Sequence, residues 1–268
     1  MAPKSFPMLF VLASAFLAVV ASDKAAKEQK LTFFFYGDWG HNVNASLAES
    51  GIAYEEVKVA NAVAQKAAEV NPSFFVMLGD NFYENGVASI EDPLWQAYYK
   101  DIYTSPSTEV PWYLILGNHD YYGGHTVLPQ IQYTTSLQNS DKRWNLPSNF
   151  YNKVFSVPGS KRTVEIFFVD TVILAPNAEN PSKTGLPPAN PDGSTSDVQL
   201  IMMQPYLQML EMQLKNSKAD YKIVAGHYHG KNYSWHTPKF FLSLRALQSS
   251  PLLTATTTLP SSRTSSCL

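Results

Sequence analysis

Three polar motifs, each directly after an apolar run, constrain the fold of this chain more than any other feature. The apolar runs are Leu31 to Tyr36, Ser73 to Leu78 and Trp112 to Leu116. Their composition predicts strands that are buried on both faces. The motifs that follow them are Gly37-Asp38-Trp39-Gly40, Gly79-Asp80-Asn81-Phe82-Tyr83 and Gly117-Asn118-His119-Asp120. Each predicted strand therefore ends in a turn with a residue type that can bind a metal ion.

Helical patterns separate these strands. Residues 52–70 have apolar side chains at spacings of three and four and end at Asn71-Pro72, which predicts a helix. A shorter amphipathic helix is predicted around Trp95 to Ile102. The order β-α-β-α-β implies a parallel sheet with right-handed crossovers, and ligands of such sheets gather at the carboxyl ends of the strands. The three motifs therefore meet at one edge of the predicted sheet.

The second half of the chain is less regular. Strands are predicted over Val164 to Val169 and over Tyr221 to Ala225, which runs into Gly226-His227. Residues 175–196 are rich in proline, asparagine, serine and glycine and predict an exposed loop. A helix between this loop and the last strand is predicted to have Pro205 at its first position, where proline is favoured. The predicted fold class is mixed α/β.

The amino terminus has the features of a secretory signal peptide over residues 1–22. Lys4 precedes an apolar stretch from Pro7 to Val20, and small residues follow at Ala21-Ser22. The alternative, a membrane anchor, needs about 20 apolar residues, which is longer than this stretch. We therefore expect a protein that is secreted or lumenal, in a compartment such as the lysosome or vacuole, without a stable membrane span after cleavage.

Composition limits the partners and the sources of stability. The net charge of −2 gives no electrostatic reason to expect nucleic acid as a partner. As a separate expectation, we expect a monomer. The hydrophobic fraction of 45% is ordinary for a globular protein. The only cysteine, Cys267, cannot form an intrachain disulfide, so the fold depends on its core. Export makes the sequons at Asn44 and Asn232 candidates for glycosylation.

The chain divides into one domain and an atypical tail. We assign the domain to residues 31–230 and a Ser/Thr-rich tail to residues 240–268. No acidic residue follows Asp220, and the tail has no clear period. Two interpretations are open: a flexible, O-glycosylated tail, or replacement or loss of the natural carboxyl-terminal part of a larger fold.

The residue types at the strand ends suit two metal ions. The two oxygens of Asp80 can bridge two cations, Asp38 can add an anionic oxygen to one of them, and Asn118 a carbonyl oxygen to the other. Tyr83 can bind as a phenolate only beside a strongly acidic cation such as Fe³⁺, because a phenol has a pKa of about 10. His227 would give the second metal a nitrogen ligand, which fits Fe²⁺, Zn²⁺ or Mn²⁺.

His119 lies within the third motif and is predicted to face the same cavity. A histidine there can bind a phosphate oxygen or stabilise charge in a transition state. The alternative is a hydrogen-bonded histidine with a structural role. His41 and His125 lie in turn-like segments and are interpreted as solvated, while spacing alone assigns no role to Asp120 or Tyr122.

These motifs closely resemble those of the purple acid phosphatases, in particular the small tartrate-resistant type, within the calcineurin-like metallophosphoesterases. The family pattern is GDxG, GDxxY, GNH(D/E), VxxH and GHxH. The first three motifs are intact here, and Val224-Ala225-Gly226-His227 matches the fourth. The similarity covers roughly residues 31–228. Tyr83 is its most specific part, because general metallophosphoesterases lack this ligand.

The resemblance implies a fold and a metal centre. The fold would be a β-sandwich of two mixed sheets flanked by helices. The centre would be dinuclear, with Fe³⁺ bound by Asp38, Asp80 and Tyr83. A divalent metal (Fe²⁺, Zn²⁺ or Mn²⁺) would share Asp80 and bind Asn118 and His227.

The resemblance also implies a reaction. It is the hydrolysis of phosphate monoesters, whether small molecules or phosphorylated peptides, at acidic pH by attack of a metal-bound hydroxide on phosphorus. His119 matches the family histidine that contacts phosphate. His236 falls where the small-type enzymes have a second catalytic histidine, although the residues around it diverge from the family.

The chain departs from the family pattern towards its carboxyl terminus. GHxH normally lies on a later strand and gives one histidine to each metal, whereas no histidine follows His236 here. Residues 226–229 spell GHxH, but the preceding helix and strand identify them as the VxxH segment. We therefore expect the last strands of the second sheet to be missing. Two alternatives to an active acid phosphatase stay open: an impaired or inactive truncated pseudoenzyme, and a calcineurin-like phosphodiesterase, against which Tyr83 argues.

Overall fold

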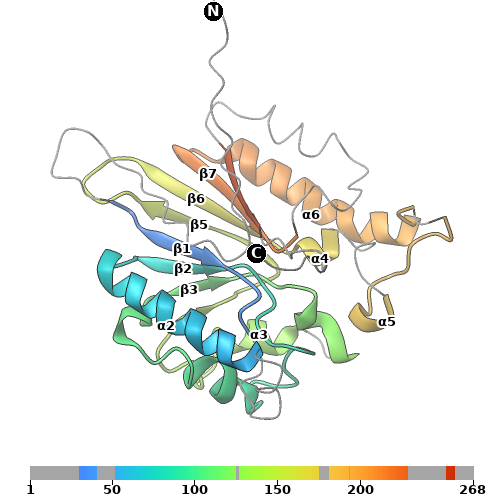
Figure 1. Cartoon of the computed structure of the whole chain (residues 1–268). Helices are drawn as coiled ribbons and strands as arrows, with labels where there is room; N and C mark the ends of the chain where they lie inside the picture. The colour runs from blue at the N-terminus through green and yellow to red at the C-terminus, as the bar shows by residue number, and fades with distance from the viewer. Residues whose placement is uncertain are drawn as a thin grey trace, which may run out of the picture.

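Two four-stranded sheets and the helices that cover them make up the fold (Figure 1). The computed structural model describes residues 30–40, 52–124, 127–174, 181–192, 194–228 and 252–256. Figure 1 shows α2 (Ile52–Val70) and α3 (Leu128–Tyr133) on the outer side of the first sheet and α6 (Asp197–Asn216) on the outer side of the second. The predicted fold class, a mixed α/β sandwich flanked by helices, is confirmed.

The first sheet has the topology that the sequence predicts. Its strands, in spatial order, are β1 (Phe33–Tyr36), β2 (Phe74–Met77), β3 (Trp112–Leu114) and β4 (Trp144–Asn145). Every neighbouring pair is parallel. Helix α2 connects β1 to β2, and the link from β2 to β3 contains a π-helix, η1 (Trp95–Lys100), and a 3₁₀ turn, η2 (Pro106–Thr108). The three motifs therefore follow three adjacent strands at the same edge of the sheet.

The second sheet is mixed, as the resemblance implies, whereas the described strands of the first sheet are all parallel and not mixed. Its strands, in spatial order, are β5 (Phe150–Ser156), β6 (Thr163–Val169), β7 (Tyr221–Gly226) and β8 (Leu252–Thr256). β5 is antiparallel to β6, and the other two pairs are parallel. Strand β8 lies inside the segment assigned to the tail, so the sheet continues for one strand past β7. The loss of further carboxyl-terminal strands stays a prediction.

Alternate strand residues fill the space between the sheets, which explains why the apolar runs are continuous. The residues that face this space include Phe33, Phe35, Phe74, Val76, Ile166, Phe168, Ile223 and Ala225. The residues between them in sequence pack under the helices, and they include Phe34, Phe75, Met77, Phe167 and Val169. Both faces of the central strands are therefore buried, and the strand ends have a rigid support.

The helix before β7 begins earlier than predicted. Ser196 caps α6, because its hydroxyl accepts the amide of Gln199 at 3.4 Å while the Gln199 side chain accepts the amide of Ser196 at 2.9 Å. This capping box satisfies amides at the start of a helix. Pro205 lies inside α6, so its predicted place at the first position is wrong. The loop predicted over 175–196 also contains a one-turn helix, α5 (Pro181–Thr184).

Replacing Pro205 with alanine is expected to stabilise the domain. Proline inside a helix lacks an amide hydrogen and clashes with the preceding turn, at a cost of about 3 kcal/mol relative to alanine. Pro205 is exposed, so alanine loses little packing. We expect urea denaturation to give a free energy of unfolding higher by about 1–3 kcal/mol. The control Gln204→Ala, at the exposed neighbouring position, is expected to change it by less than about 0.5 kcal/mol. Equal changes in both variants would contradict this explanation.

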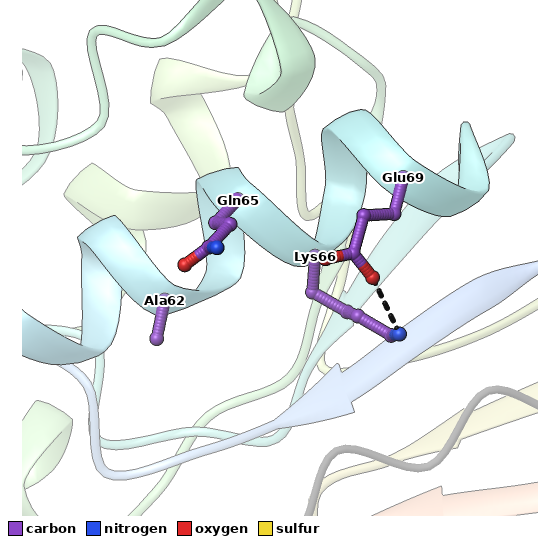
Figure 2. Close-up of a pocket in the computed structure, with 4 residues that line it drawn as sticks. All are labelled: Ala62, Gln65, Lys66 and Glu69. Carbon is purple, nitrogen blue, oxygen red and sulfur yellow. Dashed lines mark hydrogen bonds and ion pairs between the residues drawn. The ribbon is translucent and has the colours of Figure 1, made fainter.

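A shallow hollow lies on the exposed side of α2 (Figure 2). It is lined by Ala62, Gln65, Lys66 and Glu69, near the end of α2 that leads into the start of β2. Lys66 Nζ and Glu69 Oε2 are 2.7 Å apart, and both side chains are about half exposed. A pair of this kind contributes little to stability. The hollow lies at the opposite end of the sheet from the three motifs, and we assign it no function.

Among the residues that the structure describes, no helix combines the length and the apolar character that crossing a bilayer requires.

Candidate metal centre

The turns after β1 and β2 hold their acidic residues in the left-handed backbone conformation. Asp38 has a φ of 57° and Asp80 a φ of 52°. Residues other than glycine rarely adopt such values, and those that do are often at functional sites. The amide of Asp38 donates to the Gly79 carbonyl at 3.0 Å, and the amide of Gly40 donates to the Asp80 carbonyl at 3.2 Å. These bonds join the two turns and place the two carboxylates side by side.

The turn after β3 approaches the turn after β2 so closely that only glycine fits between them. A Cβ atom on Gly117 would lie 2.2 Å from Asp80 Oδ1. The backbone amide of His119 donates to the same oxygen at 3.0 Å. The third motif therefore contacts Asp80 directly and brings Asn118 to the cluster.

Tyr83 lies between the two carboxylates. Its hydroxyl is 2.5 Å from Asp80 Oδ2 and 3.2 Å from Asp38 Oδ1. The side chain is buried, with 7% of its surface exposed. Three oxygen groups from the first two motifs therefore converge at one point.

His227 adds a nitrogen to this group from the end of β7. Its Nδ1 is 2.8 Å from the Leu78 carbonyl, which can only accept, so Nδ1 carries a hydrogen. Nε2 lies 3.0 Å from Asn118 Oδ1 and 3.5 Å from Asp80 Oδ1, and it is an acceptor whenever the ring is neutral. The Asn118 amide nitrogen donates to the Tyr122 hydroxyl at 2.7 Å, which turns Oδ1 toward His227. With a neutral ring, three acceptor atoms therefore face one another.

Acceptor atoms that face one another fit a bound cation. One ligand atom each from Asp38, Asp80 and His227 lies within 4.8 Å of the others. Tyr83 and Asn118 contact this group, so the structure brings together all five predicted metal ligands. Carboxylate, amide, phenol and imidazole groups form the mixed oxygen and nitrogen set that suits iron, zinc or manganese. The residues present therefore fit the metal centre that the sequence predicts.

His119 lies at the edge of the cluster, with 21% of its side chain exposed. Its Nδ1 is 2.8 Å from the Glu84 carbonyl, which orients the ring and leaves Nε2 on the other side. The ring also packs against Tyr83 and Tyr122, with centroids 4.2 and 4.6 Å away. The ring is thus held in place beside the cluster, as a phosphate contact requires, and its role stays a prediction.

Asp120 is an important buried residue to which the sequence assigns no role. Its carboxylate accepts hydrogen bonds from the amides of Gly117 (2.9 Å), Asn81 (3.0 Å) and Phe82 (3.3 Å). The Gln130 side chain donates to it at 2.9 Å. Asp120 therefore joins the turn after β2 to the turn after β3. The only signal in the sequence is its place in the third motif, which does not specify these partners.

Some predictions concern residues outside the described ranges. These are the signal peptide over 1–22, the sequons at Asn44 and Asn232, Cys267, and His41, His125 and His236. Their predicted roles stay predictions.

A family comparison identifies the domain. The family model of the calcineurin-like phosphoesterases matches residues 31–248 of the chain. The chain belongs to the calcineurin-like phosphoesterases. The five residues of the cluster all lie inside the matched range.

The chain is also similar to curated acid phosphatases. It is 35% identical to tartrate-resistant acid phosphatase type 5 of Sus scrofa, over 84% of this chain and 60% of that protein. It is 36% identical to the Homo sapiens protein of the same name, over 78% of this chain and 59% of that protein. It is 34% identical to purple acid phosphatase 4 of Arabidopsis thaliana, over 77% of this chain and 54% of that protein. The predicted resemblance is confirmed, and the chain spans between half and two thirds of the length of these relatives.

A solved structure has a similar fold. Its title is "GAP50 the anchor in the inner membrane complex of Plasmodium". The TM-score is 0.56, and the match covers 80% of this chain and 61% of that chain. At 21% identity the likeness concerns the fold alone.

Burial and mutual repulsion shift the acids of the phosphoesterase domain. Burial, together with repulsion from Asp80, raises the pKa of Asp38 to about 6, and attraction to His227 partly offsets this shift. The same two causes raise the pKa of Asp120 to about 7. Burial and the nearby carboxylates raise the pKa of Tyr83 far above its usual value. Burial lowers the pKa of His227, but the carboxylates outweigh it and the net shift is upward. Without a cation these shifts favour the protonated forms of the acids, and a bound cation would favour the ionised forms.

These shifts predict that the metal-free domain loses stability between about pH 4, near the ordinary pKa of aspartate, and about pH 7. A carboxyl group whose pKa rises on folding stabilises the fold while protonated, and this contribution is lost as pH rises through the folded-state pKa. Asp38 and Asp120 titrate in this interval, and the raised pKa of His227 acts in the same direction. In EDTA, urea denaturation is expected to give a free energy of unfolding that falls by on the order of a few kcal/mol.

Added metal is expected to flatten this dependence, because a bound cation stabilises the ionised carboxylates. The exposed residues Asp192 and Asp220 do not contribute, since hydrogen bonds lower their pKa and they titrate below the interval. Stability that increases with pH in EDTA, or the same slope with and without metal, would contradict the assignment of the buried acids.

Proposed function

We propose that the domain hydrolyses phosphate monoesters at a dimetal centre formed by the strand-end cluster. The observation that carries this proposal is that His227 Nε2 lies 3.0 Å from Asn118 Oδ1 and 3.5 Å from Asp80 Oδ1, while the other oxygen of Asp80 contacts the Tyr83 hydroxyl. Membership of the calcineurin-like phosphoesterases and similarity to named acid phosphatases support the same reaction class.

Each residue of the cluster has a proposed place in the metal centre. Asp38, Asp80 and Tyr83 would hold Fe³⁺, and Asp80, Asn118 and His227 would hold Fe²⁺, Zn²⁺ or Mn²⁺. Two bound metals would supply Lewis acidity toward the phosphoryl group and a water of lowered pKa. Tyr83 selects for the more acidic cation, because its buried phenol gives up a proton only to a cation of that kind.

Other residues of the chain have proposed roles in binding and orientation. His119 would contact a phosphoryl oxygen through Nε2, while its Nδ1 stays bonded to the Glu84 carbonyl. Asp120 holds the two ligand turns against each other and so keeps the cluster in shape. His236 would act as a second acid or base, by its place relative to His227 in the family pattern.

Reconstitution with Fe³⁺ and Zn²⁺ tests this function. The expected result at acidic pH is turnover of p-nitrophenyl phosphate that stops on chelation and exceeds turnover of the diester bis(p-nitrophenyl) phosphate. Faster turnover of the diester would favour the phosphodiesterase alternative. A chain that binds two metals and hydrolyses neither ester above the rate in buffer would favour the impaired pseudoenzyme.

We also propose that the protein enters the secretory pathway, is glycosylated and acts on phosphate esters there. The signal-peptide pattern over residues 1–22 and the sequons support this location. Expression in eukaryotic cells tests it by amino-terminal sequencing of the protein from the medium. An intact amino terminus found only in the cytosol would contradict it.

A further inference from the structure

The proposed ligands of the second metal come from different sheets. Asn118 follows β3 in the first sheet, and His227 follows β7 in the second, yet their ligand atoms are 3.0 Å apart. A metal site tolerates little displacement of its ligands. The distance between these two residues therefore depends on what joins the carboxyl ends of the two sheets.

Besides the hydrogen bond between His227 Nδ1 and the Leu78 carbonyl, one side-chain cluster joins the sheets at this end. The Tyr121 hydroxyl donates to Asp170 Oδ2, and the Asn149 side chain donates to Asp170 Oδ2 at 2.8 Å and to the Tyr121 hydroxyl at 3.0 Å. Tyr121 belongs to η3 (His119–Gly124), and its amide donates to the carbonyl of Asn118 at 3.0 Å. Asp170 directly follows β6. The cluster thus connects the asparagine turn to the second sheet.

The connection continues from Asp170 to both neighbours of His227. Asp170 Oδ1 accepts the amides of Val172 and Ile173 at 3.1 and 3.2 Å, which caps α4 (Thr171–Leu174). The hydroxyl of Thr171 accepts the amide of Tyr228 at 2.8 Å. The methyl group of Thr171 packs against Gly226, where an added Cβ would lie 2.5 Å from it. Thr171 therefore contacts the residues on either side of His227.

We infer that Tyr121, Asn149, Asp170 and Thr171, here called the sheet bridge, position Asn118 against His227 and so set the affinity of the second metal. The inference rests on the proposed metal centre. None of the four residues is a proposed ligand, so they act as positioning residues. Asp38 and Tyr83 reach the first metal through turns of the first sheet alone, so the bridge acts on the second metal selectively.

The experiment measures the two metals separately in the full chain. The visible absorption of the Fe³⁺-loaded chain reports the first metal, and competition with a fluorescent chelator gives the affinity for Zn²⁺ at the second. The variants are Tyr121→Phe, Asp170→Asn and Thr171→Val, each close in shape to the residue it replaces. Tyr133→Phe is the matched control, because it also removes one buried tyrosine hydroxyl. This hydroxyl donates to the Gln138 carbonyl at 3.0 Å, and Tyr133 lies outside the bridge.

The bridge variants are expected to bind Zn²⁺ at least about tenfold more weakly, by analogy with outer-shell residues of metal sites. Their visible absorption is expected to match that of the unmodified chain, and the control is expected to keep both signals. Zn²⁺ affinity within about twofold of the unmodified chain in the folded bridge variants would overturn the inference, as would an equal loss in the control. Thr171→Val decides the matter if the other two variants do not fold. An unmodified chain that binds no metal would overturn the proposed centre and this inference together, and that failure is seen before any variant is made.

Discussion

The Asp80→Asn variant is expected to lose both metals and to hydrolyse phosphate monoesters more than about 100-fold more slowly, since even outer-shell changes at metal sites cost 10–100-fold. Asp80 is the residue on which the cluster converges. Its Oδ2 is 2.5 Å from the Tyr83 hydroxyl, and its Oδ1 is 3.5 Å from His227 Nε2. Asparagine keeps the shape but loses the charge and one acceptor oxygen, so it cannot bridge two cations. Metal content by elemental analysis and turnover of p-nitrophenyl phosphate measure the two effects.

The matched control for this variant is Asp197→Asn, at the exposed start of α6. It makes the same chemical change at an exposed residue that is not part of the cluster, and it is expected to leave metal content and turnover unchanged. An Asp80→Asn variant that still binds two metals would show that Asp80 does not bridge them.

The Tyr83→Phe variant is expected to lose the visible absorption of the Fe³⁺-loaded chain completely. That absorption requires a phenolate bound to Fe³⁺. Tyr83 is placed to supply it, because its hydroxyl lies between Asp80 Oδ2 and Asp38 Oδ1. Burial and these carboxylates keep the phenol protonated in the metal-free state, so the band is also expected to appear only when Fe³⁺ is added. Absorption spectra of the two chains before and after addition of iron measure this.

Tyr122→Phe provides the matched control for the loss of colour. It removes a hydroxyl from the same site, 2.7 Å from the Asn118 amide nitrogen, but not a proposed ligand of Fe³⁺. This variant is expected to keep the visible band. A Tyr83→Phe variant that stays coloured would remove the feature that separates the chain from general metallophosphoesterases and would favour the phosphodiesterase alternative.

Local sequence patterns predict much of the first sheet. The run from Leu31 to Tyr36 and the periodicity over residues 52–70 are features of neighbouring residues, and β1 and α2 form there. β5 has no continuous apolar run. It pairs with β6 alone among the described strands, and most of its side chains are partly or fully exposed, so its sequence does not need to be apolar. Pro205 misleads because the start of α6 is decided by the capping box at Ser196, nine residues earlier.

The sequence also predicts part of the candidate site. Asp38, Asp80 and Asn118 follow apolar strands directly, so adjacent parallel strands bring them together. His227 comes from the other sheet, and only the family pattern connects it with the first three motifs. Asp120 and the sheet bridge could not be predicted, because their roles depend on hydrogen bonds between residues far apart in sequence, such as that from Tyr121 to Asp170.

Anomalous X-ray diffraction from crystals of the chain loaded with iron and zinc tests the central claim most directly. The proposed centre predicts two anomalous peaks that share Asp80. The iron peak is expected next to Asp38 and Tyr83, and the zinc peak next to Asn118 and His227. Metals bound elsewhere, or a cluster that stays free of metal while the chain hydrolyses phosphate esters, would contradict the proposed dimetal centre.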